Sequence, residues 1–324
     1  MRYFVTGCTG FIGIHLCRLL ISEGHEVYGL VRNPGKIPSD LRGKLKVVEG
    51  GLDIFEHADL VLPEVDIVVH LAGIITGRNR TDYLHVNYEA MVHLVDALNR
   101  QFWRPMRFIL ASSLAAAGPN RDEHPLCESD EATPIEPYGL AKLKSEQFLR
   151  LQSFPVTIFR PPAVVGPGDP AMLTLFNIVK RGVGLLPSGN PQLLSFIYVG
   201  DLVEAIYIMS KEQSDSNKLY FVTSEERVTN RDIVNEIAVS LQKKILIIRI
   251  PKCLVWLLMA VSTAISNLFR TRNFYDYRQY KQMTTPAFVC TSELLTAETG
   301  WKAKTGLAEA IRLSAEGYKE MNWL

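Results

Sequence analysis

The first half of the chain alternates short runs of β-branched and aromatic residues with longer stretches whose apolar positions follow a helical period. Residues 2–6 (RYFVT) predict a buried strand, and residues 11–23 predict a helix with Ile14, Leu16, Leu19 and Leu20 on one face. The same periods predict further strands at 26–31, 45–48, 66–71, 107–112 and 155–160, and further helices at about 83–101 and 138–152. Strands that alternate with helices are joined by right-handed crossovers, so we expect an α/β protein with a doubly wound parallel sheet.

The pattern changes after Arg160, where the segment PPAVVGPGDP predicts a loop by its prolines and glycines. Residues 196–209 (FIYVGDLVEAIYIM) predict a strand that runs into a helix, and from about residue 225 we expect mostly helix. We therefore expect a large nucleotide-binding domain of residues 1–165, to which 195–224 return. Residues 166–194 and 225–324 then form a smaller, mostly helical substrate-binding domain.

Residues 253–269 (CLVWLLMAVSTAISNLF) are nearly all apolar and are flanked by Lys252, Arg270 and Arg272. A spanning helix needs about 20 apolar residues, and the polar residues in the far half of this segment weaken it further. We favour a buried or interface helix. Peripheral contact with a membrane, or a dimer surface, is the alternative.

Composition excludes several classes of protein. The 324 residues suit one large domain or two medium ones, and 35 Lys and Arg against 34 Asp and Glu leave no basic surplus for nucleic acid. The five cysteines are scattered and the seven histidines lack metal-ligand spacing, so we expect neither a disulfide framework nor a metal site. The opening MRYFVTG predicts a strand and not a signal peptide, which favours the cytoplasm.

The first strand ends in a glycine-rich loop, Thr6-Gly7-Cys8-Thr9-Gly10-Phe11-Ile12-Gly13, which opens the first helix. Glycines at 7, 10 and 13 allow the backbone to approach a pyrophosphate, and the helix N-terminus supplies free N–H groups. Because the loop follows a strand within a βαβ unit, we expect a Rossmann-like dinucleotide site that includes Thr9, Phe11 and Ile12.

Two further groups of residues point to proton transfer. Tyr138 and Lys142 in YGLAK lie four residues apart, so on a helix they share one side. Residues 111–113 (ASS) end a strand at the carboxyl edge of the sheet, where ligands bind in such folds. A phenol has an ordinary pKa near 10 and needs cations nearby to act near neutral pH, and Lys142 would supply one.

With TGxxGFIG, VVHLAG (68–73), VNYEAMVHLVDAL (86–98) and FRPPAVVGPG (159–168), the chain resembles the extended short-chain dehydrogenase/reductases. It is most similar to their NAD-dependent epimerase/dehydratase branch, including bacterial flavonol- and hydroxysteroid-reductase-like members. The resemblance implies that Tyr138 is the acid/base, that Lys142 assists it, and that Ser113, with Ser112 as the alternative, binds the substrate oxygen. It also implies a cofactor site that contains Leu52, Leu71, Ala72, Gly73, Asn87, Pro161 and Val164 besides Tyr138 and Lys142. For Asn87, a helix cap or another structural hydrogen bond is the alternative.

The cofactor site departs from the family pattern at the adenosine end. The acidic residue that usually ends the second strand is replaced by Val31 or Arg32, and an arginine there can pair with a ribose 2′-phosphate. We therefore expect NADP(H) to be preferred and leave NAD(H) open; otherwise Arg32 stacks on adenine or faces water. Asp53 comes two positions after the place where the family has its adenine-binding carboxylate, and we expect it to cap the next helix.

The substrate side is less polar than in nucleotide-sugar enzymes, with Leu194 near the usual arginine, Pro162 and Ala163 near the usual asparagine, and Ala117 in place of an aromatic. We therefore expect hydride transfer between the nicotinamide and a small-molecule carbonyl or alcohol. A nucleotide-sugar epimerase or dehydratase and a non-catalytic cofactor-sensing regulator are the alternatives. The resemblance also implies a homodimer built on helices 83–101 and 138–152.

Overall fold

The computed structural model describes residues 1–77, 79–120, 124–212, 214–269 and 280–324. Seven parallel strands form the central sheet, in the order β11-β6-β5-β4-β1-β2-β3. They are β1 (Arg2–Thr6), β2 (Glu26–Val31), β3 (Lys46–Glu49), β4 (Ile67–His70), β5 (Arg107–Ala111), β6 (Val156–Arg160) and β11 (Lys218–Phe221). The doubly wound parallel sheet is confirmed.

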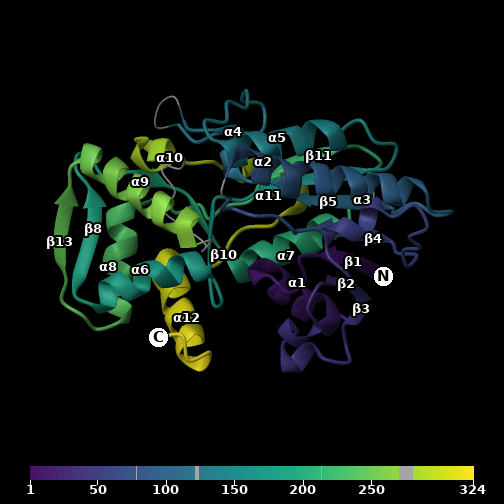
Figure 1. Ribbon diagram of the computed structural model, residues 1–324, viewed down its shortest axis with the longest axis horizontal. Coiled ribbons are helices and arrows are strands. Elements are labelled where there is room, and N and C mark those ends of the chain that lie inside the picture. Colours follow the sequence, from purple (N-terminus) through teal and green to yellow (C-terminus); the bar gives the residue numbers. More distant parts are fainter. Residues whose placement is uncertain (78, 121–123, 213, 270–279) are drawn as a thin grey trace.

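Helices cover both faces of this sheet (Figure 1). Helices α1 (Phe11–Ser22) and α7 (Val199–Ser210) pack together on one face, and α3 (Ala90–Asn99) and α5 (Pro137–Leu149) cover the other. Short helices α2 (Arg80–Leu84), α4 (Leu114–Ala117) and α11 (Glu293–Thr299) and the 3₁₀ turns 34–36, 39–41 and 52–56 complete this layer structure. Both faces of β1, β4, β5 and β6 are buried, which explains their continuous apolar runs, whereas the edge strand β3 is mostly exposed.

The helix predicted at 83–101 is wrong as a single element. A π-helical turn, His85–Glu89, separates α2 from α3. Asn87 lies in this turn, where its side-chain amide binds both backbone groups of Ile74 and its carbonyl accepts a hydrogen bond from Ser145 Oγ. These tertiary contacts accompany the change from α-helical to π-helical hydrogen bonding. The spacing of apolar residues in the sequence does not predict them.

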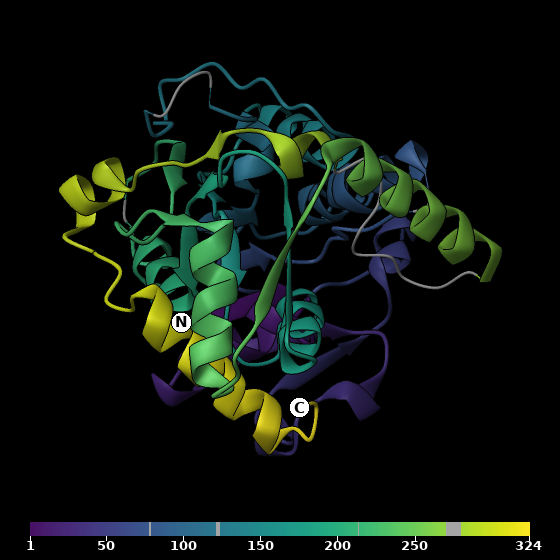
Figure 2. The same cartoon turned by 90° about the vertical axis from the view of Figure 1, so that its left-hand side faces the viewer.

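The second part of the molecule lies beyond the carboxyl edge of the sheet (Figures 1 and 2). Its helices are α6 (Pro170–Lys180), α8 (Asn230–Ser240), α9 (Lys252–Phe269), α10 (Tyr280–Thr284) and α12 (Leu307–Glu320). Its strands pair as β8 (Val183–Pro187) with β13 (Leu246–Ile250), and β9 (Leu193–Leu194) with β12 (Val228–Thr229) and β14 (Ala287–Phe288). Strands β7 (Ala163–Val165) and β10 (Phe196–Tyr198) form a parallel pair between the two parts. The described residues of this mostly helical part therefore contain five short strands that the sequence pattern did not predict.

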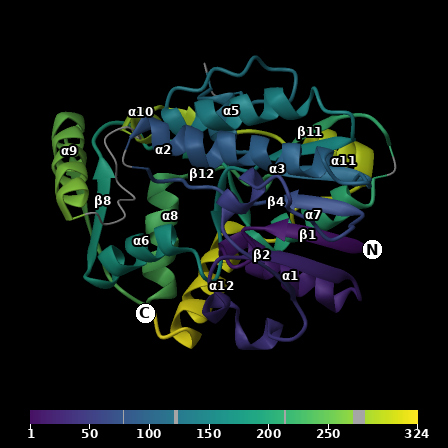
Figure 3. The same cartoon turned by 45° about the vertical axis from the view of Figure 1, so that its right-hand side comes forward.

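Helix α9 covers the predicted apolar segment 253–269 and begins one residue earlier, at Lys252. It is not a fully buried helix, and the interface that was expected as the other outcome stays a prediction. It stands at the periphery of the molecule (Figures 2 and 3), and most of its large apolar side chains are exposed, from 42% at Leu254 to 78% at Leu268, whereas Met259 is buried. Within the part of the chain that the structure describes, no helix is long and apolar enough to cross a bilayer.

Candidate active site

The glycine-rich loop occupies the crevice where the strand order reverses, between the carboxyl ends of β1 and β4. Gly7 has φ +72°, and a Cβ there would lie 2.8 Å from the backbone nitrogen of Ala72. A Cβ at Gly13 would collide with the Gly7 carbonyl. The loop therefore needs glycine at both positions to bring β1, α1 and the β4 end together.

The same loop fits the pyrophosphate of a dinucleotide. Gly10 is the N-cap of α1, and the N–H groups of a first helical turn have no intrahelical acceptor. Thr9, Gly10, Phe11 and Ile12 all keep some solvent exposure, so an anion can reach this end of α1. The helix N-terminus and the absent side chains thus provide a cradle of the kind that the cofactor requires.

Residues after β4 line the next part of the crevice. The Ala72 N–H donates to Thr6 Oγ1 over 3.3 Å, and the Thr6 hydroxyl lies 2.8 Å from His70 Nδ1. Burial lowers the pKa of His70 to about 3, with Lys142 adding to the effect, so this histidine is neutral. Beyond it, a Cβ on Gly73 would lie 3.3 Å from Lys142 Nζ, which places Leu71, Ala72 and Gly73 beside the predicted catalytic lysine.

Ser113, Tyr138 and Lys142 come together at the carboxyl ends of β5 and β6. Ser113 caps α4 by accepting a hydrogen bond from Ala115 N, and its hydroxyl is close enough to Tyr138 to lower the pKa of that phenol. Lys142 Nζ lies 5.9 Å from the centroid of the Tyr138 ring and donates to the Ala111 carbonyl over 2.7 Å. The start of α5 is fixed by Glu136, whose carboxylate accepts from the N–H groups of Tyr138 and Gly139.

The two titratable groups of this cluster are shifted toward their neutral forms. Burial raises the pKa of Tyr138 above its ordinary value, although the Ser113 hydroxyl opposes the shift. Burial lowers the pKa of Lys142 to about 8, and the charge of Glu146 opposes that shift. A buried phenol and a lysine that titrates near neutral pH are the perturbations that proton transfer uses.

The two candidate serines are differently engaged. The Ser112 hydroxyl donates a hydrogen bond to the Glu146 carboxylate. The same carboxylate accepts hydrogen bonds from Nε and Nη2 of Arg160, at 2.9 and 2.6 Å. Glu146 and Arg160 are both buried, so Ser112 belongs to a closed ion-pair network behind the site. Ser113 lies on the Tyr138 side, which favours it as the residue that meets the substrate oxygen. Neither Glu146 nor Arg160 was predicted as a site residue from the sequence; the only local signal is that Glu146 lies one helical turn after Lys142.

Asn87 lies within the same region but both ends of its amide bind Ile74, at 3.0 Å each. The structural hydrogen bond left open for Asn87 is therefore present, and contact with cofactor stays a prediction. The Pro161 carbonyl accepts from Leu114 N, and Val164 lies in β7. These positions border the crevice from the β6 side.

At the adenosine end, Arg32 is exposed immediately after β2, and its Cδ would lie 3.7 Å from a Cβ on Gly51. Leu52 is half-buried against the adjoining core. The cap predicted at Asp53 is wrong: Gly51 is the N-cap of the 3₁₀ turn 52–56, and Asp53 lies within its first turn. The contact of Arg32 with a ribose substituent stays a prediction.

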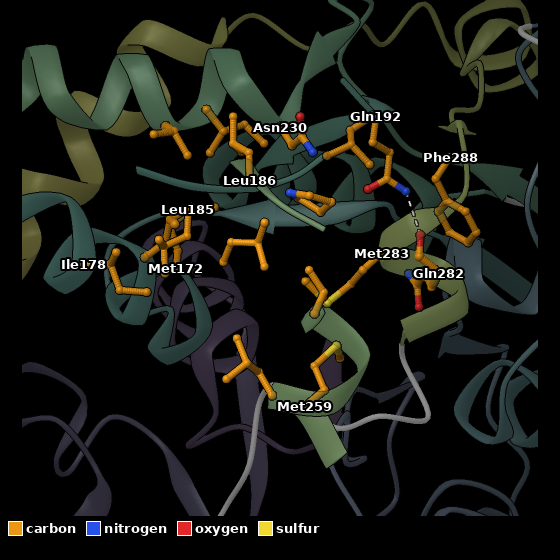
Figure 4. Close-up of a pocket in the computed structure, with 18 of the residues that line it drawn as sticks. Met172, Ile178, Leu185, Leu186, Gln192, Asn230, Met259, Gln282, Met283 and Phe288 are labelled. Carbon is orange, nitrogen blue, oxygen red and sulfur yellow. Dashed lines mark hydrogen bonds between the residues drawn. The ribbon is translucent and has the colours of Figure 1, made fainter. Parts of the chain in front are cut away.

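A cavity of about 620 Å³ lies in the second part of the molecule, among α6, β8, α8, α9 and α10 (Figure 4). No lysine, arginine, histidine, aspartate or glutamate among the described residues lines it. Its lining is Met172, Leu175, Ile178, Leu185, Leu186, Pro187, Gln192, Leu194, Asn230, Ile233, Val234, Ile250, Val255, Leu258, Met259, Ser262, Gln282, Met283 and Phe288. Nearly every polar group in this wall is an uncharged amide.

The cavity wall adjoins the helix that Ser113 caps. Leu194 and Phe288 line the cavity and also pack in one apolar cluster with Leu114 and Ala117 of α4. Of the three places where the sequence predicted an apolar substrate side, Leu194 lines the cavity and Ala117 packs behind it. Pro162 and Ala163 are not part of the lining. Neither are Lys180 and Arg181.

Comparison with known proteins places this geometry in context. A ceramide reductase of Caulobacter vibrioides (strain NA1000 / CB15N) is 25% identical over 327 residues, 99% of this chain and 95% of the relative. A UDP-glucose 4-epimerase of Vibrio cholerae is 26% identical over 335 residues, 98% of this chain and 95% of the relative. The solved structure of MoeE5 with UDP-glucuronic acid and NAD has the same fold, with a TM-score of 0.77 at 21% identity over 99% of this chain and 100% of that one.

A family model covers residues 3–222, which contain the glycine-rich loop, the Ser113, Tyr138 and Lys142 cluster and the strands that carry them. This span is more than half of the chain. Together with the full-length relatives, it identifies an enzyme of the extended short-chain dehydrogenase/reductase type. The chain belongs to the NAD dependent epimerase/dehydratase family.

Proposed function

We propose that this protein is an NAD(P)(H)-dependent oxidoreductase that moves hydride between nicotinamide and the carbonyl or alcohol carbon of an apolar substrate. The observation that carries the proposal is the apolar cavity whose wall packs in one cluster with α4, the helix that Ser113 caps, and has no charged side chain among its described residues. A small-molecule substrate of this kind needs an apolar site with few polar groups to orient it.

Tyr138 is the proposed acid/base. Reduced nicotinamide, when bound, supplies a hydride, that is, two electrons and the hydrogen nucleus for the carbonyl carbon. The carbonyl oxygen then takes the proton from the Tyr138 hydroxyl, and solvent returns a proton to the phenolate. Ser113 donates a hydrogen bond to the same oxygen, and the Lys142 ammonium lowers the free energy of the phenolate. The reverse sequence oxidises an alcohol.

Arg32 supports NADP(H) as the preferred cofactor. It is exposed at the end of β2, where an acidic residue would otherwise accept hydrogen bonds from a ribose hydroxyl. A guanidinium cannot accept but pairs with a 2′-phosphate. MoeE5 is described in complex with NAD, so the preference for NADP(H) is a distinct property proposed for this chain.

A nucleotide sugar suits the cavity poorly. Its diphosphate carries about two negative charges, and burying them without cationic partners is strongly unfavourable. Lys180 and Arg181, which could have paired with such charges, are exposed at the end of α6 and outside the lining. Arg270 lies outside the described residues. The relative named for reduction of ceramide, similar over nearly the whole chain, agrees with an apolar substrate.

A nucleotide-sugar epimerase is the second candidate, and the full-length similarity to the Vibrio cholerae UDP-glucose 4-epimerase favours it. It would reduce and reoxidise its cofactor within one cycle, whereas a reductase consumes added NADPH. We also expect a homodimer in the cytoplasm, and analytical ultracentrifugation tests the dimer.

The deciding experiment measures NADPH oxidation with a panel of apolar and aromatic ketones and aldehydes, and thermal stabilisation by UDP- and dTDP-sugars with cofactor present. We expect turnover of at least one carbonyl class and no stabilisation by the sugars. Stabilisation by a nucleotide sugar alone would establish the epimerase. Cofactor binding with no turnover on either panel would instead favour a cofactor-sensing regulator.

A further inference from the structure

Helix α9 presents apolar side chains on two adjoining sides. Val255, Leu258, Met259 and Ser262 line the 620 Å³ cavity. Leu254, Leu257, Val261, Ile265 and Leu268 follow the three- and four-residue spacing of a single helix face and are 42–78% exposed. We call this second set the outer stripe.

The cavity opens toward this exposed apolar surface. Leu258 lines the cavity and is 51% exposed, and Leu185 on β8 lines it and is 40% exposed. An apolar path therefore runs from the outer stripe into the cavity without crossing a charged side chain of the described wall. A large exposed apolar surface of this kind marks a contact with another apolar partner.

The charge of the surrounding chain favours one partner. Residues 237–275 contain six basic residues (Lys243, Lys244, Arg249, Lys252, Arg270 and Arg272) and no aspartate or glutamate. Arg249 and Lys252, immediately before and at the start of α9, are exposed. An apolar helix in a basic segment fits the surface of an anionic bilayer, where the helix lies in the interface and cations meet the headgroups.

A second copy of the chain is a poorer partner for the outer stripe. Symmetric pairing through α9 would bring two such basic segments together with no acidic residue from either of them. It would also cover Leu258 and Leu185 at the mouth of the cavity. An anionic bilayer would instead bring acidic headgroups to the basic segment and would cover these two residues with acyl chains, the source of the proposed substrate.

One polar atom in the cavity wall has an unused hydrogen-bonding capacity. The Oδ1 atom of Asn230 is buried without a hydrogen-bond partner, and Asn230 lines the cavity. This oxygen can accept a hydrogen bond from an uncharged hydroxyl or amide group of a bound molecule.

We propose that the outer stripe of α9 docks the enzyme on anionic membranes, and that the cavity takes the aliphatic chain of a bilayer-resident carbonyl lipid. This inference rests on the proposed reductase function and specifies its substrate class. A lipid that enters from the bilayer would keep its aliphatic chain in apolar surroundings all the way to the cavity, since α9 contributes both to the outer stripe and to the cavity wall.

Membrane docking is tested by flotation of the full-length protein with phosphatidylcholine vesicles and with vesicles that also contain phosphatidylglycerol. We expect binding to the anionic vesicles, and we expect salt to weaken it. The double variant Leu257→Glu/Ile265→Glu should lose more than tenfold in vesicle affinity, because both wild-type side chains move from water into the bilayer on binding. Val61→Glu/Leu151→Glu is the matched control, since both residues are 84% exposed and lie on the large domain. Equal binding by the two variants would overturn the docking surface, as would stripe-dependent dimerisation without vesicle binding.

Chain recognition is tested with straight-chain methyl ketones, from hexanone to hexadecanone, in detergent and with NADPH. We expect kcat/KM to rise about fourfold per methylene until the cavity is filled. Leu175→Trp, which places a larger side chain in the cavity wall, should stop the rise at a shorter chain. Asn177→Trp on the exposed side of α6 should not, and thermal unfolding checks that both variants fold.

The experiments distinguish failure of the chain-binding cavity from failure of the reductase function. Reduction of short and long ketones with equal kcat/KM would overturn the chain-binding cavity and leave the reductase function standing. Absence of turnover on every carbonyl would overturn the reductase function and, with it, the assignment of the cavity to a carbonyl lipid. Vesicle binding is measured without substrate, so it reports on the outer stripe in either case.

Discussion

Lys142→Met should make the protein more stable near neutral pH while it abolishes turnover. Lys142 is only 3% exposed, and burial lowers its pKa from 10.5 to about 8. That difference means that the folded state disfavours the charged form by about 3 kcal/mol relative to the unfolded chain. Methionine has a similar length and carries no charge, so the variant escapes this penalty.

One contact offsets part of the gain. Lys142 Nζ donates to the Ala111 carbonyl over 2.7 Å, and loss of that donor costs about 1–2 kcal/mol. We therefore expect Lys142→Met to raise the free energy of unfolding by about 1–2 kcal/mol near pH 7. Turnover should be lost because the phenolate of Tyr138 loses its cation. Cofactor binding should weaken as well, because we expect the ammonium to contact the nicotinamide ribose.

The pH dependence gives the sharper measurement. Below pH 8 both the folded and the unfolded wild type hold the proton, so the folded state carries the whole penalty. Between pH 8 and 10.5 the folded state releases the proton first, and wild-type stability rises relative to the variant. The difference between the two proteins should therefore shift by about 2–3 kcal/mol in favour of the wild type from about pH 7 to about pH 10.

Urea denaturation of both proteins across this pH range measures the shift. Lys144→Met is the matched control, since Lys144 is exposed on the same helix and its removal should change stability by no more than about 0.5 kcal/mol. A stability difference between Lys142→Met and wild type that stays constant with pH would refute the argument. It would mean that the ammonium is not held in a desolvated site.

Three further predictions concern the site. Tyr138→Phe should lower kcat by about 10²–10⁴ and leave the Kd for cofactor nearly unchanged, as measured by stopped-flow turnover and calorimetry; substantial retained activity would remove Tyr138 from the acid/base role. Arg32→Ala should weaken NADP(H) about tenfold in a calorimetric titration without affecting NAD(H); equal wild-type affinities for the two cofactors would contradict the proposed phosphate pairing. Ser113→Ala should lower kcat about 10²–10³, whereas Ser112→Ala should mainly lower Tm through the Glu146 network; the reverse result would exchange the two serines.

The central sheet could be predicted because its information is local. Each strand of the large domain is a short apolar run between turn residues, and each covering helix has one apolar face. Predicted strand boundaries differ from the structure by at most one residue for β1 to β6, since turn residues bound each apolar run, and all of these strands except the exposed edge strand β3 are largely buried. The glycine-rich loop could also be predicted from the sequence, because close backbone contacts at the start of the first βα unit require glycine at positions 7 and 13.

Features that depend on contacts between residues far apart in the chain could not be predicted from the sequence. The π-helical turn at His85–Glu89 depends on Asn87 binding Ile74 and on Ser145 from α5. The ion pair between Glu146 and Arg160 joins a helix to the following strand, and nothing in either segment indicates that the two charges are buried together. The cavity is assembled from elements between residues 172 and 288, so its volume has no local signature.

Helix α9 illustrates why apolar periodicity leaves two outcomes open. A segment that is apolar all round is typical of a buried helix, and the expectation of burial followed from that rule. The structure gives only one side of α9 to the cavity and leaves the outer stripe in solvent. Removing apolar surface from water stabilises a protein by about 25 cal/mol per Å². The exposed side chains of the outer stripe gain this free energy only when a partner covers them. An apolar partner that replaces the water accounts for both sides of α9 at once, because the lipid that covers the outer stripe also supplies the chain for the cavity.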